Sequence, residues 1–376
     1  MKTISRQIML SIGVSIIVAG LVAMGFVVGQ YTIIRTFDAQ IQSMSKAFTL
    51  GGILDDQNKL AVTRAYYGGA SVLHQLNDIT WAVPNIPTPF VGNAPTPGQF
   101  GVAYNNSMQF RAKNEIEIPK PTNTFRIFLT GGSTAYGSGA PSQDRTIAGY
   151  LSQILERNLS PSTNLKYEVF TMANPAWATT HERIIIENRL SELHPDLVIS
   201  FSGNNDVHWG KLGRNVLWFR NYSDEFFLNL IKTVYKLTDQ EPIPEVTQID
   251  PREIAPYLVA KRLIKNVKLS SFALSQNNVD YVFLLQPNLA VTGKSLTERE
   301  RKSLKYQDYF QKCYAQIDSV LRDFDADNYN YINLANVFDN INDHEDIFID
   351  SYHFGDKGNE IVAESIYHKV KDMIIQ

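Results

Sequence analysis

The positions of apolar residues divide the chain into two parts. From about residue 105 onward, short apolar runs rich in β-branched residues alternate with stretches in which apolar side chains recur every three to four residues. The first pattern is typical of strands buried on both faces, and the second is typical of helices with one apolar face. The expected strands cover residues 125–130, 167–172, 196–202, 280–285 and 331–334, and the expected helices cover 146–159, 181–193, 297–324 and 356–375.

This alternation predicts an α/β fold of three layers, in which helices cover both faces of a parallel sheet. Five strands favour the flavodoxin-like strand order. More than 70 residues separate Asp206 from Asp280, too many for a simple connection, so we expect a helical insertion at about 207–275. Its aromatic residues form either the core of the insertion or a wall that faces the substrate; they are Trp209, Trp218, Phe219, Tyr222, Phe226 and Phe227.

The N-terminal region has a different pattern, with one long apolar run from Ile8 to Val28. As a helix this run is roughly 32 Å long, which matches a bilayer core of about 30 Å. Lys2 and Arg6 precede it, which favours an N-terminus inside the cell and the rest of the chain across the membrane. A cleaved signal peptide is the alternative, but its apolar region is usually shorter and ends at a small-residue cleavage site.

These patterns predict three regions. Residues 1–34 are a single-pass membrane anchor that contacts the lipid bilayer through residues 8–28, and residues 105–376 form the folded domain, in the periplasm or outside the cell. Residues 35–104 connect the two. Five prolines lie between positions 83 and 98, and they predict an extended spacer, or a strap laid along the domain surface.

Composition excludes several kinds of function. Charged residues make up 19% of the chain and the net charge is −3, which indicates neither a nucleic-acid surface nor an acidic tail. The single cysteine, Cys313, excludes an internal disulfide and any metal site built from several cysteines. Nothing in the composition indicates an oligomeric state.

The sequence "RIFLTGGSTAYGSG", residues 126–139, predicts a buried strand that ends in a glycine-rich turn around Ser133. A phosphate-binding loop of the Walker type needs a lysine after its second glycine, and here Ser138 follows Gly137. The glycine spacing of a dinucleotide-binding turn is absent as well. The remaining alternatives are a nucleophilic serine and a tight connection without chemistry.

A nucleophilic serine needs a base, and the base needs a group that orients it. His353 is the best candidate base, because Asp350 lies three residues earlier and can hold Nδ1–H while Nε2 faces the serine. We interpret His344 as part of a solvated acidic loop. His74 and His368 are expected to be structural or surface residues.

An acyl transfer also needs hydrogen-bond donors for the developing oxyanion. Asn205 follows the third strand and its amide is a candidate donor, together with the backbone N–H of Ser133. Ordinary turn chemistry is the alternative for Asn205, because asparagine and glycine are common in turns. That alternative weakens because all these residues follow strands, and the carboxyl ends of parallel strands meet at one edge of the sheet.

In this order the motifs resemble those of the SGNH (GDSL-like) hydrolases. "GGSTAYG" resembles the first block with Ser133 as the nucleophile, "GNND" resembles the block that carries Asn205, and "DSYH" resembles the block that carries Asp350 and His353. The lead-in to the first block resembles the subgroup with a GGST form. The resemblance covers roughly residues 105–373. It implies a Ser-His-Asp triad without metal or cofactor, supported by Gly131, Gly132, Gly203, Asp206 and Asn174.

The chain departs from the family pattern at two points. Gly132 replaces the aspartate of the first block. The second block, "NPAWATT", lacks the glycine whose backbone N–H joins the oxyanion hole in the family, so Ala176 or Ala178 is expected to donate instead, with Asn174 as the clear anchor.

The resemblance implies a membrane-anchored serine esterase that acts on O-acyl groups, such as O-acetyl, of glycans or envelope polymers. Two alternatives stay open. An O-acyltransferase would use the same site with a sugar hydroxyl in place of water. A catalytically inactive binding or scaffold protein of polysaccharide assembly would keep the fold without the reaction.

Overall fold

The computed structural model describes residues 2–213, 224–241 and 252–375. Strands β5 to β9 of the described chain form one parallel sheet in the order β6-β5-β7-β8-β9, so the predicted α/β fold and flavodoxin-like order are confirmed. The strands are β5 (Thr124–Gly131), β6 (Lys166–Ala173), β7 (Leu197–Ser202), β8 (Asp280–Leu285) and β9 (Tyr329–Asn333).

Alternate residues of the strands pack on opposite faces of this sheet, which explains the apolar runs within β5, β7 and β8. Phe128, Val198 and Phe283 belong to one buried cluster, whereas Leu129 and Ile199 belong to the other. The first face is covered by α7 (Thr179–Ile185), α10 (Pro256–Ser275) and α12 (Gln307–Arg322), and the second by α5 (Ile147–Asn158) and α13 (Asp356–Ile375).

Shorter helices follow the carboxyl ends of the strands or join the larger elements. Tyr306 adopts a left-handed conformation with a φ of 53°, so the helix expected at 297–324 is two helices, α11 (Glu298–Ser303) and α12. The helix expected at 181–193 is α-helical only up to Ile185, and it continues as a π turn and then a 3-10 turn. The short helices are α4 (Ser133–Tyr136), α6 (Ser160–Thr163), α8 (Asn204–Lys211) and α11 (Glu298–Ser303).

The long connection between β7 and β8 contains α8, α9 (Asp224–Leu237) and α10. Buried residues of α10, including Leu263 and Val267, lie in the same cluster as the sheet, so α10 is part of the helical layer. Five aromatic side chains of the expected insertion lie outside the described side chains; they are Trp218, Phe219, Tyr222, Phe226 and Phe227.

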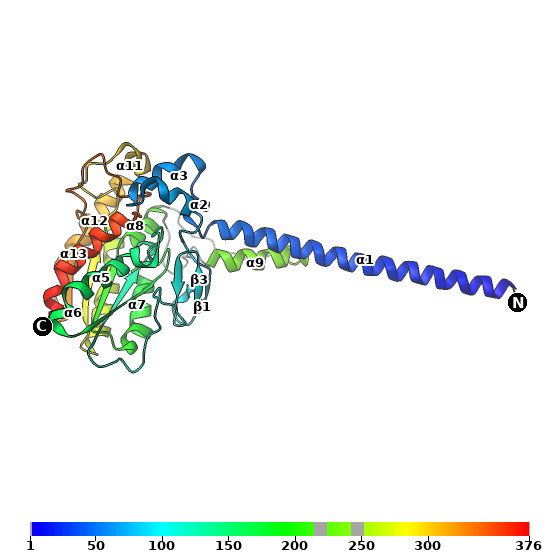
Figure 1. Cartoon of the computed structure of the whole chain (residues 1–376), viewed down its shortest axis with the longest axis horizontal. Helices are drawn as coiled ribbons and strands as arrows, with labels where there is room; N and C mark the ends of the chain where they lie inside the picture. Colours follow the sequence, from blue (N-terminus) through cyan, green and yellow to red (C-terminus); the bar gives the residue numbers. More distant parts are fainter. Residues whose placement is uncertain (1, 214–223, 242–251, 376) are drawn as a thin grey trace.

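Helix α1 (Lys2–Lys46) extends away from the rest of the chain as a long rod (Figure 1). Its segment Ile12–Ala39 has a mean hydropathy of 2.5 and no buried side chains, and by length and composition it is able to cross a membrane. In the described residues it is the one helix that meets this test. The apolar helix expected from the sequence is therefore present, and it continues beyond the apolar segment.

Residues 47–82 fold into a small unit that we call the N-terminal cap. It contains α2 (Leu50–Ile53), α3 (Asp56–Val62) and 3-10 turns at Thr63–Ala65 and Gly69–Gln75. The proline-rich strap, residues 83–98, follows it and forms the hairpin of β1 (Asn85–Thr88) and β2 (Gly92–Pro95) and the first residue of β3. A second hairpin joins β3 (Gly98–Phe100) to β4 (Ala103–Asn105) and leads into the α/β domain.

Candidate active site

Ser133 lies at the carboxyl end of β5, where the chain turns into α4. The turn requires the two preceding glycines. A Cβ on Gly131 would lie 2.3 Å from the Phe201 carbonyl oxygen, and a Cβ on Gly132 would lie 2.3 Å from the Asn205 Nδ2 atom. The "GG" of the sequence therefore lets the serine turn pack directly against the neighbouring strand β7 and against Asn205.

Ser133, His353 and Asp350 form a continuous hydrogen-bonded series. The Ser133 Oγ lies 2.6 Å from His353 Nε2, and His353 Nδ1 lies 2.9 Å from an Asp350 carboxylate oxygen. These residues come from the first strand and from the loop before the last helix, 220 positions apart. The series has the geometry of the Ser-His-Asp triad of serine hydrolases, with the aspartate holding the imidazole so that Nε2 faces the serine.

Asp350 is kept ionised by its neighbours. Desolvation raises the pKa of its carboxyl, but the His353 ring and the backbone N–H groups of Tyr352 and His353 outweigh that effect and lower the pKa below the usual value. An ionised Asp350 favours the tautomer with the proton on Nδ1, which leaves a lone pair on Nε2 for the serine hydroxyl.

A buried ion pair holds the chain that leads to Asp350. The Lys294 Nζ lies 2.8 Å from a Glu300 carboxylate oxygen, and both side chains are fully buried. The other Glu300 oxygen accepts hydrogen bonds from the backbone N–H groups of Ile347 and Phe348, at 2.9 and 3.1 Å. Because α11 and this loop are joined in this way, the position of Asp350 depends on residues that the sequence motifs do not include.

Asn205 lies beside Ser133, at the first turn of α8. Its Nδ2 donates one hydrogen bond to the Trp177 carbonyl, at 2.7 Å, and the same atom packs against Gly132. An amide nitrogen carries two hydrogens, so one donor remains for a ligand at Ser133. The placement agrees with the expected role of Asn205 as an oxyanion donor.

The second block forms a tight turn from Asn174 to Trp177. The Trp177 N–H donates to the Asn174 carbonyl at 3.0 Å, Pro175 occupies the second position, and Ala176 occupies the third with a φ of 72°. A type II turn has this positive φ at its third position, which glycine prefers. Ala176 thus stands in the conformation suited to the missing glycine of the family pattern.

Two backbone N–H groups are further candidate donors on this side of the site. In the described part of the chain, neither the Ser133 N–H nor the Ala176 N–H has a hydrogen-bond acceptor. Ala178, the other candidate, uses its N–H on His181 Nδ1 at 3.1 Å, so it is not free to bind a ligand. Ala176 is therefore the better candidate of the two.

The remaining supporting residues hold these turns together. The Asp206 carboxylate accepts from the N–H and the hydroxyl of Thr179, at 3.1 and 2.7 Å, and so fixes the start of α7 after the second block. Asn174 donates to Asn93 of the strap at 3.1 Å. Gly203 has a φ of 104°, and a Cβ there would lie 2.6 Å from Leu285. The strap is thus tied to the oxyanion side of the site.

Sequence reasoning missed several residues around the site. Arg111 is buried and donates to the carbonyls of Tyr136 and Gly137, at 2.8 and 2.9 Å, so it fixes the end of the serine turn. Trp81 of the N-terminal cap packs against His353, with ring centroids 4.3 Å apart. No motif indicates either contact, because both join segments far apart in the sequence.

Other histidines lie away from the triad. His344 is exposed and pairs with Asp343 at 3.3 Å, as expected for an acidic loop. His74 and His368 are also exposed. His208 and Trp209 on α8 lie near the site instead, where the His208 ring packs against Trp209 and Tyr352. Of the aromatic residues expected to face a substrate, Trp209 is the one whose described position suits that role.

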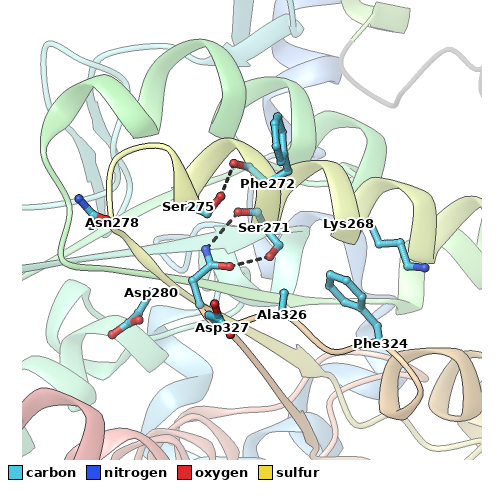
Figure 2. Close-up of a pocket in the computed structure, with 10 residues that line it drawn as sticks. Lys268, Ser271, Phe272, Ser275, Asn278, Asp280, Phe324, Ala326 and Asp327 are labelled. Atoms are coloured by element: carbon cyan, nitrogen blue, oxygen red, sulfur yellow. Dashed lines mark hydrogen bonds between the residues drawn. The ribbon is translucent and has the colours of Figure 1, made fainter.

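A separate cavity of about 690 Å³ lies at the opposite end of the sheet (Figure 2). Asp280, the first residue of β8, lines it together with Phe272 of α10 and Phe324. Ser133 follows the carboxyl end of its strand, so this cavity has no part in the triad. Among the described residues, no group of three or more His, Cys, Asp or Glu side chains is arranged to hold a metal ion.

Comparison with known proteins gave matches only among solved structures; no family model matches the chain, and no curated protein matches it. An acetyl xylan esterase structure is 17% identical over 65% of this chain and 100% of its own, with a TM-score of 0.42. A lipase/acylhydrolase from Enterococcus faecalis is 15% identical over 66% of this chain and 96% of its own, also with a TM-score of 0.42. A lipolytic protein of the G-D-S-L family from Desulfitobacterium hafniense is 11% identical over 65% and 98%, with a TM-score of 0.38.

The sheet order is the one expected, and Ser133, Asn205, Asp350 and His353 meet at the carboxyl edge of that sheet. The chain therefore has the α/β fold that its resemblance to the SGNH hydrolases implies.

Proposed function

We propose that this protein is a serine hydrolase of the SGNH type that cleaves carboxylic esters. The observation that carries the proposal is the hydrogen-bonded series from Ser133 through His353 to Asp350, at 2.6 and 2.9 Å. A nucleophilic serine needs a base within hydrogen-bond distance and a group that orients this base, and Ser133 has both. That arrangement activates a weak nucleophile.

The proposed reaction has two halves. His353 Nε2 takes the Ser133 proton while Oγ attacks the acyl carbon, and the Asn205 amide and the N–H groups of Ser133 and Ala176 bind the oxyanion. His353 then gives its proton to the alcohol oxygen as the carbon–oxygen bond breaks, which leaves an acyl-enzyme. Water, activated by His353 in turn, releases the acid and restores Ser133.

We further propose that the substrate carries O-acyl groups, such as O-acetyl, on a glycan or an envelope polymer, and that α1 anchors the enzyme in a membrane. The length and apolar character of Ile12–Ala39 support the anchor. The basic residues before it favour a cytoplasmic N-terminus and a catalytic domain in the periplasm or outside the cell. Protease treatment of intact cells or spheroplasts should digest the catalytic domain; protection from protease there would overturn this orientation.

A fluorophosphonate probe tests the serine assignment directly. The probe reacts with activated serines, so we expect mass spectrometry to find one labelled peptide, which contains Ser133. The unlabelled protein should release acetate from an acetylated sugar, and this release should stop once Ser133 has reacted with the probe. A folded protein that neither reacts with the probe nor releases acetate would instead favour the inactive binding or scaffold alternative.

The transferase alternative is tested in the same assay. An unacetylated oligosaccharide is added to the acetyl donor, and the products are separated by mass. For a hydrolase we expect free acetate to account for all the donor consumed. Appearance of acetylated oligosaccharide in larger amount than free acetate would identify an O-acyltransferase with the same acyl-enzyme.

A further inference from the structure

The N-terminal cap shares a hydrophobic core with the loop that carries the catalytic histidine. Ile349, next to Asp350, is buried in the cap's cluster together with Leu50 and Val72. A Cβ on Gly355, just after His353, would lie 2.1 Å from the Ala65 carbonyl oxygen of the cap. The cap therefore packs directly on the segment from Ile349 to Gly355.

The cap also contacts the loop that follows the serine turn. The Tyr66 hydroxyl donates to the Gly139 carbonyl at 2.7 Å, and the Gly139 N–H donates to the Thr80 carbonyl at 2.9 Å. The Ser138 hydroxyl donates to the Trp81 carbonyl. Residues 80 and 81 are thus held between the serine loop and the histidine loop.

Trp81 projects from this junction onto His353. The two ring centroids are 4.3 Å apart and the rings are tilted by 59°. The Trp81 backbone is fixed by its N–H, which donates to the Phe48 carbonyl at 2.7 Å. Its side chain is only partly buried, and in the described part of the chain its indole N–H has no acceptor. Trp81 therefore offers an apolar face and an unused indole donor beside the triad.

The position of Trp81 indicates which part of a bound ester would lie next to the indole ring. His353 Nε2 gives its proton to the oxygen of the departing alcohol, so that alcohol must lie next to the imidazole. The acyl oxygen points the other way, toward Asn205 and Ala176. We therefore infer that a ring packed on the imidazole borders the alcohol part of the ester.

We propose that Trp81 is a specificity-determining residue that the N-terminal cap contributes to the leaving-group side of the site, where its indole packs on a sugar ring. This inference rests on the proposed esterase function. A sugar ring offers C–H groups to an aromatic face and hydroxyls to the indole N–H, whereas a small alcohol such as ethanol reaches neither. The cap is then part of the active site, and not only a connection to α1.

The test compares two acetate esters that share the acyl group and differ in the alcohol. Full-length protein is assayed on fully acetylated methyl xyloside and on ethyl acetate. For Trp81→Ala we expect the ratio of the two kcat/KM values to fall by roughly 10-fold or more, the order of discrimination that one hydrophobic contact supplies. Trp81→Phe keeps an aromatic face and should recover most of the ratio.

Phe272→Ala is the matched control, because Phe272 is 65% exposed and lines the cavity at the far end of the sheet (Figure 2). It should leave the ratio unchanged. An equal fall on both esters in Trp81→Ala, with slower fluorophosphonate labelling, would mean that Trp81 only positions His353 and would overturn the proposal. An unchanged ratio in Trp81→Ala would overturn it too.

Failure of the proposed function itself gives a different result. In that case the wild-type protein hydrolyses neither ester and Ser133 is not labelled, so no ratio exists to compare. Thermal unfolding of each variant separates both outcomes from loss of the fold, and Trp81→Phe provides a second variant if Trp81→Ala unfolds.

Discussion

In the proposed site, the groups on one side of Ser133 are side chains, and the groups on the other side are mostly backbone N–H donors. The proton-transfer side consists of His353 and Asp350, already hydrogen-bonded to Ser133 and to each other. The oxyanion side consists of Asn205 and two backbone N–H groups, one of them on Ala176 in a conformation that alanine rarely adopts. Side-chain chemistry demands particular residue types, whereas a backbone donor demands only a particular turn.

Because of this difference, we expect the two sides to tolerate different sequence changes. The proton-transfer side needs a base and a group that orients it, and few residue types meet those needs. A backbone N–H can be donated by any residue whose φ and ψ place it correctly, and glycine is the residue that adopts a positive φ at least cost. The turn from Asn174 to Trp177 reaches that conformation with alanine. The following predictions test the comparison, from the largest expected effect to the smallest.

Loss of the proposed nucleophile should have the largest effect on ester hydrolysis, because His353 and Asp350 then have no serine hydroxyl to activate. Ser133→Ala should lower kcat for an acetyl ester by roughly 10⁴-fold or more, because the triad acts as a unit. The unfolding midpoint should change little, since the hydroxyl contributes one partly buried hydrogen bond. Ser162→Ala, an exposed serine at a helix end, is the control and should retain full activity. Ester turnover at the wild-type rate by a purified Ser133→Ala protein would refute the assignment.

Loss of Asn205 should weaken the oxyanion side without abolishing it. Asn205→Ala removes one of three expected donors, so kcat should fall by about 10²–10³-fold with a smaller change in KM. Steady-state kinetics on an acetyl ester measure both. Asn188→Ala, at an exposed position on the helical segment after α7, should have no effect. A loss as large as that of Ser133→Ala would contradict the idea that backbone donors share the oxyanion.

Ionisation of Glu182 in α7 should make the free energy of unfolding depend on pH. Burial raises the pKa of its carboxyl from 4.5 to about 7, and nearby Asp206 adds to the shift. Because the folded pKa lies above the unfolded one, this group lowers the free energy of unfolding as pH rises from about 4.5 to about 7, and no further above that. Glu182→Gln removes the ionisable carboxyl and with it this fall in stability, so the variant should be more stable than the wild type at pH 8 by about 1–3 kcal/mol.

Denaturant unfolding of both proteins across this pH range measures the effect. His181, whose pKa burial lowers to about 4, has the opposite sign, because its stability contribution is lost as pH falls from about 6.5. It is present in both proteins, so the difference between them isolates Glu182. If the stability gain of the glutamine variant were the same at pH 4.5 and pH 8, Glu182 would not be the titrating group.

The smallest expected effect concerns Ala176. Ala176→Gly removes the side chain from a position with positive φ, which relieves strain, while glycine adds entropy to the unfolded chain. We expect a change in unfolding free energy within about 1 kcal/mol and kcat within about 3-fold. Ala176→Val, which disfavours this conformation more strongly, should lower both stability and kcat. Equal kcat values for the glycine and valine variants would show that this turn does not hold an oxyanion donor.

Much of the α/β domain is predictable from the sequence because its strands and helices have strong periodicity. The break at Tyr306, which divides one expected helix into α11 and α12, was not predictable, since a left-handed tyrosine has no local signal. The buried pair of Lys294 and Glu300 was also missed. Such a pair looks like surface charge in the sequence, and only burial shows that it holds the loop before Asp350.

The sequence by itself determined which side chains are candidates for the chemistry, because Ser133, Asn205, Asp350 and His353 follow strands whose carboxyl ends meet at one edge of a parallel sheet. Only the tertiary structure decided what surrounds them. No sequence motif marks the N-terminal cap, yet the cap packs on the loop of Asp350 and His353. It places the Trp81 ring centroid 4.3 Å from that of His353. Ala176 has a residue type that gives no hint of a special backbone conformation, yet it adopts the positive φ that glycine prefers. Contacts between distant segments and backbone conformation depend on packing, which periodicity and motif spacing do not record.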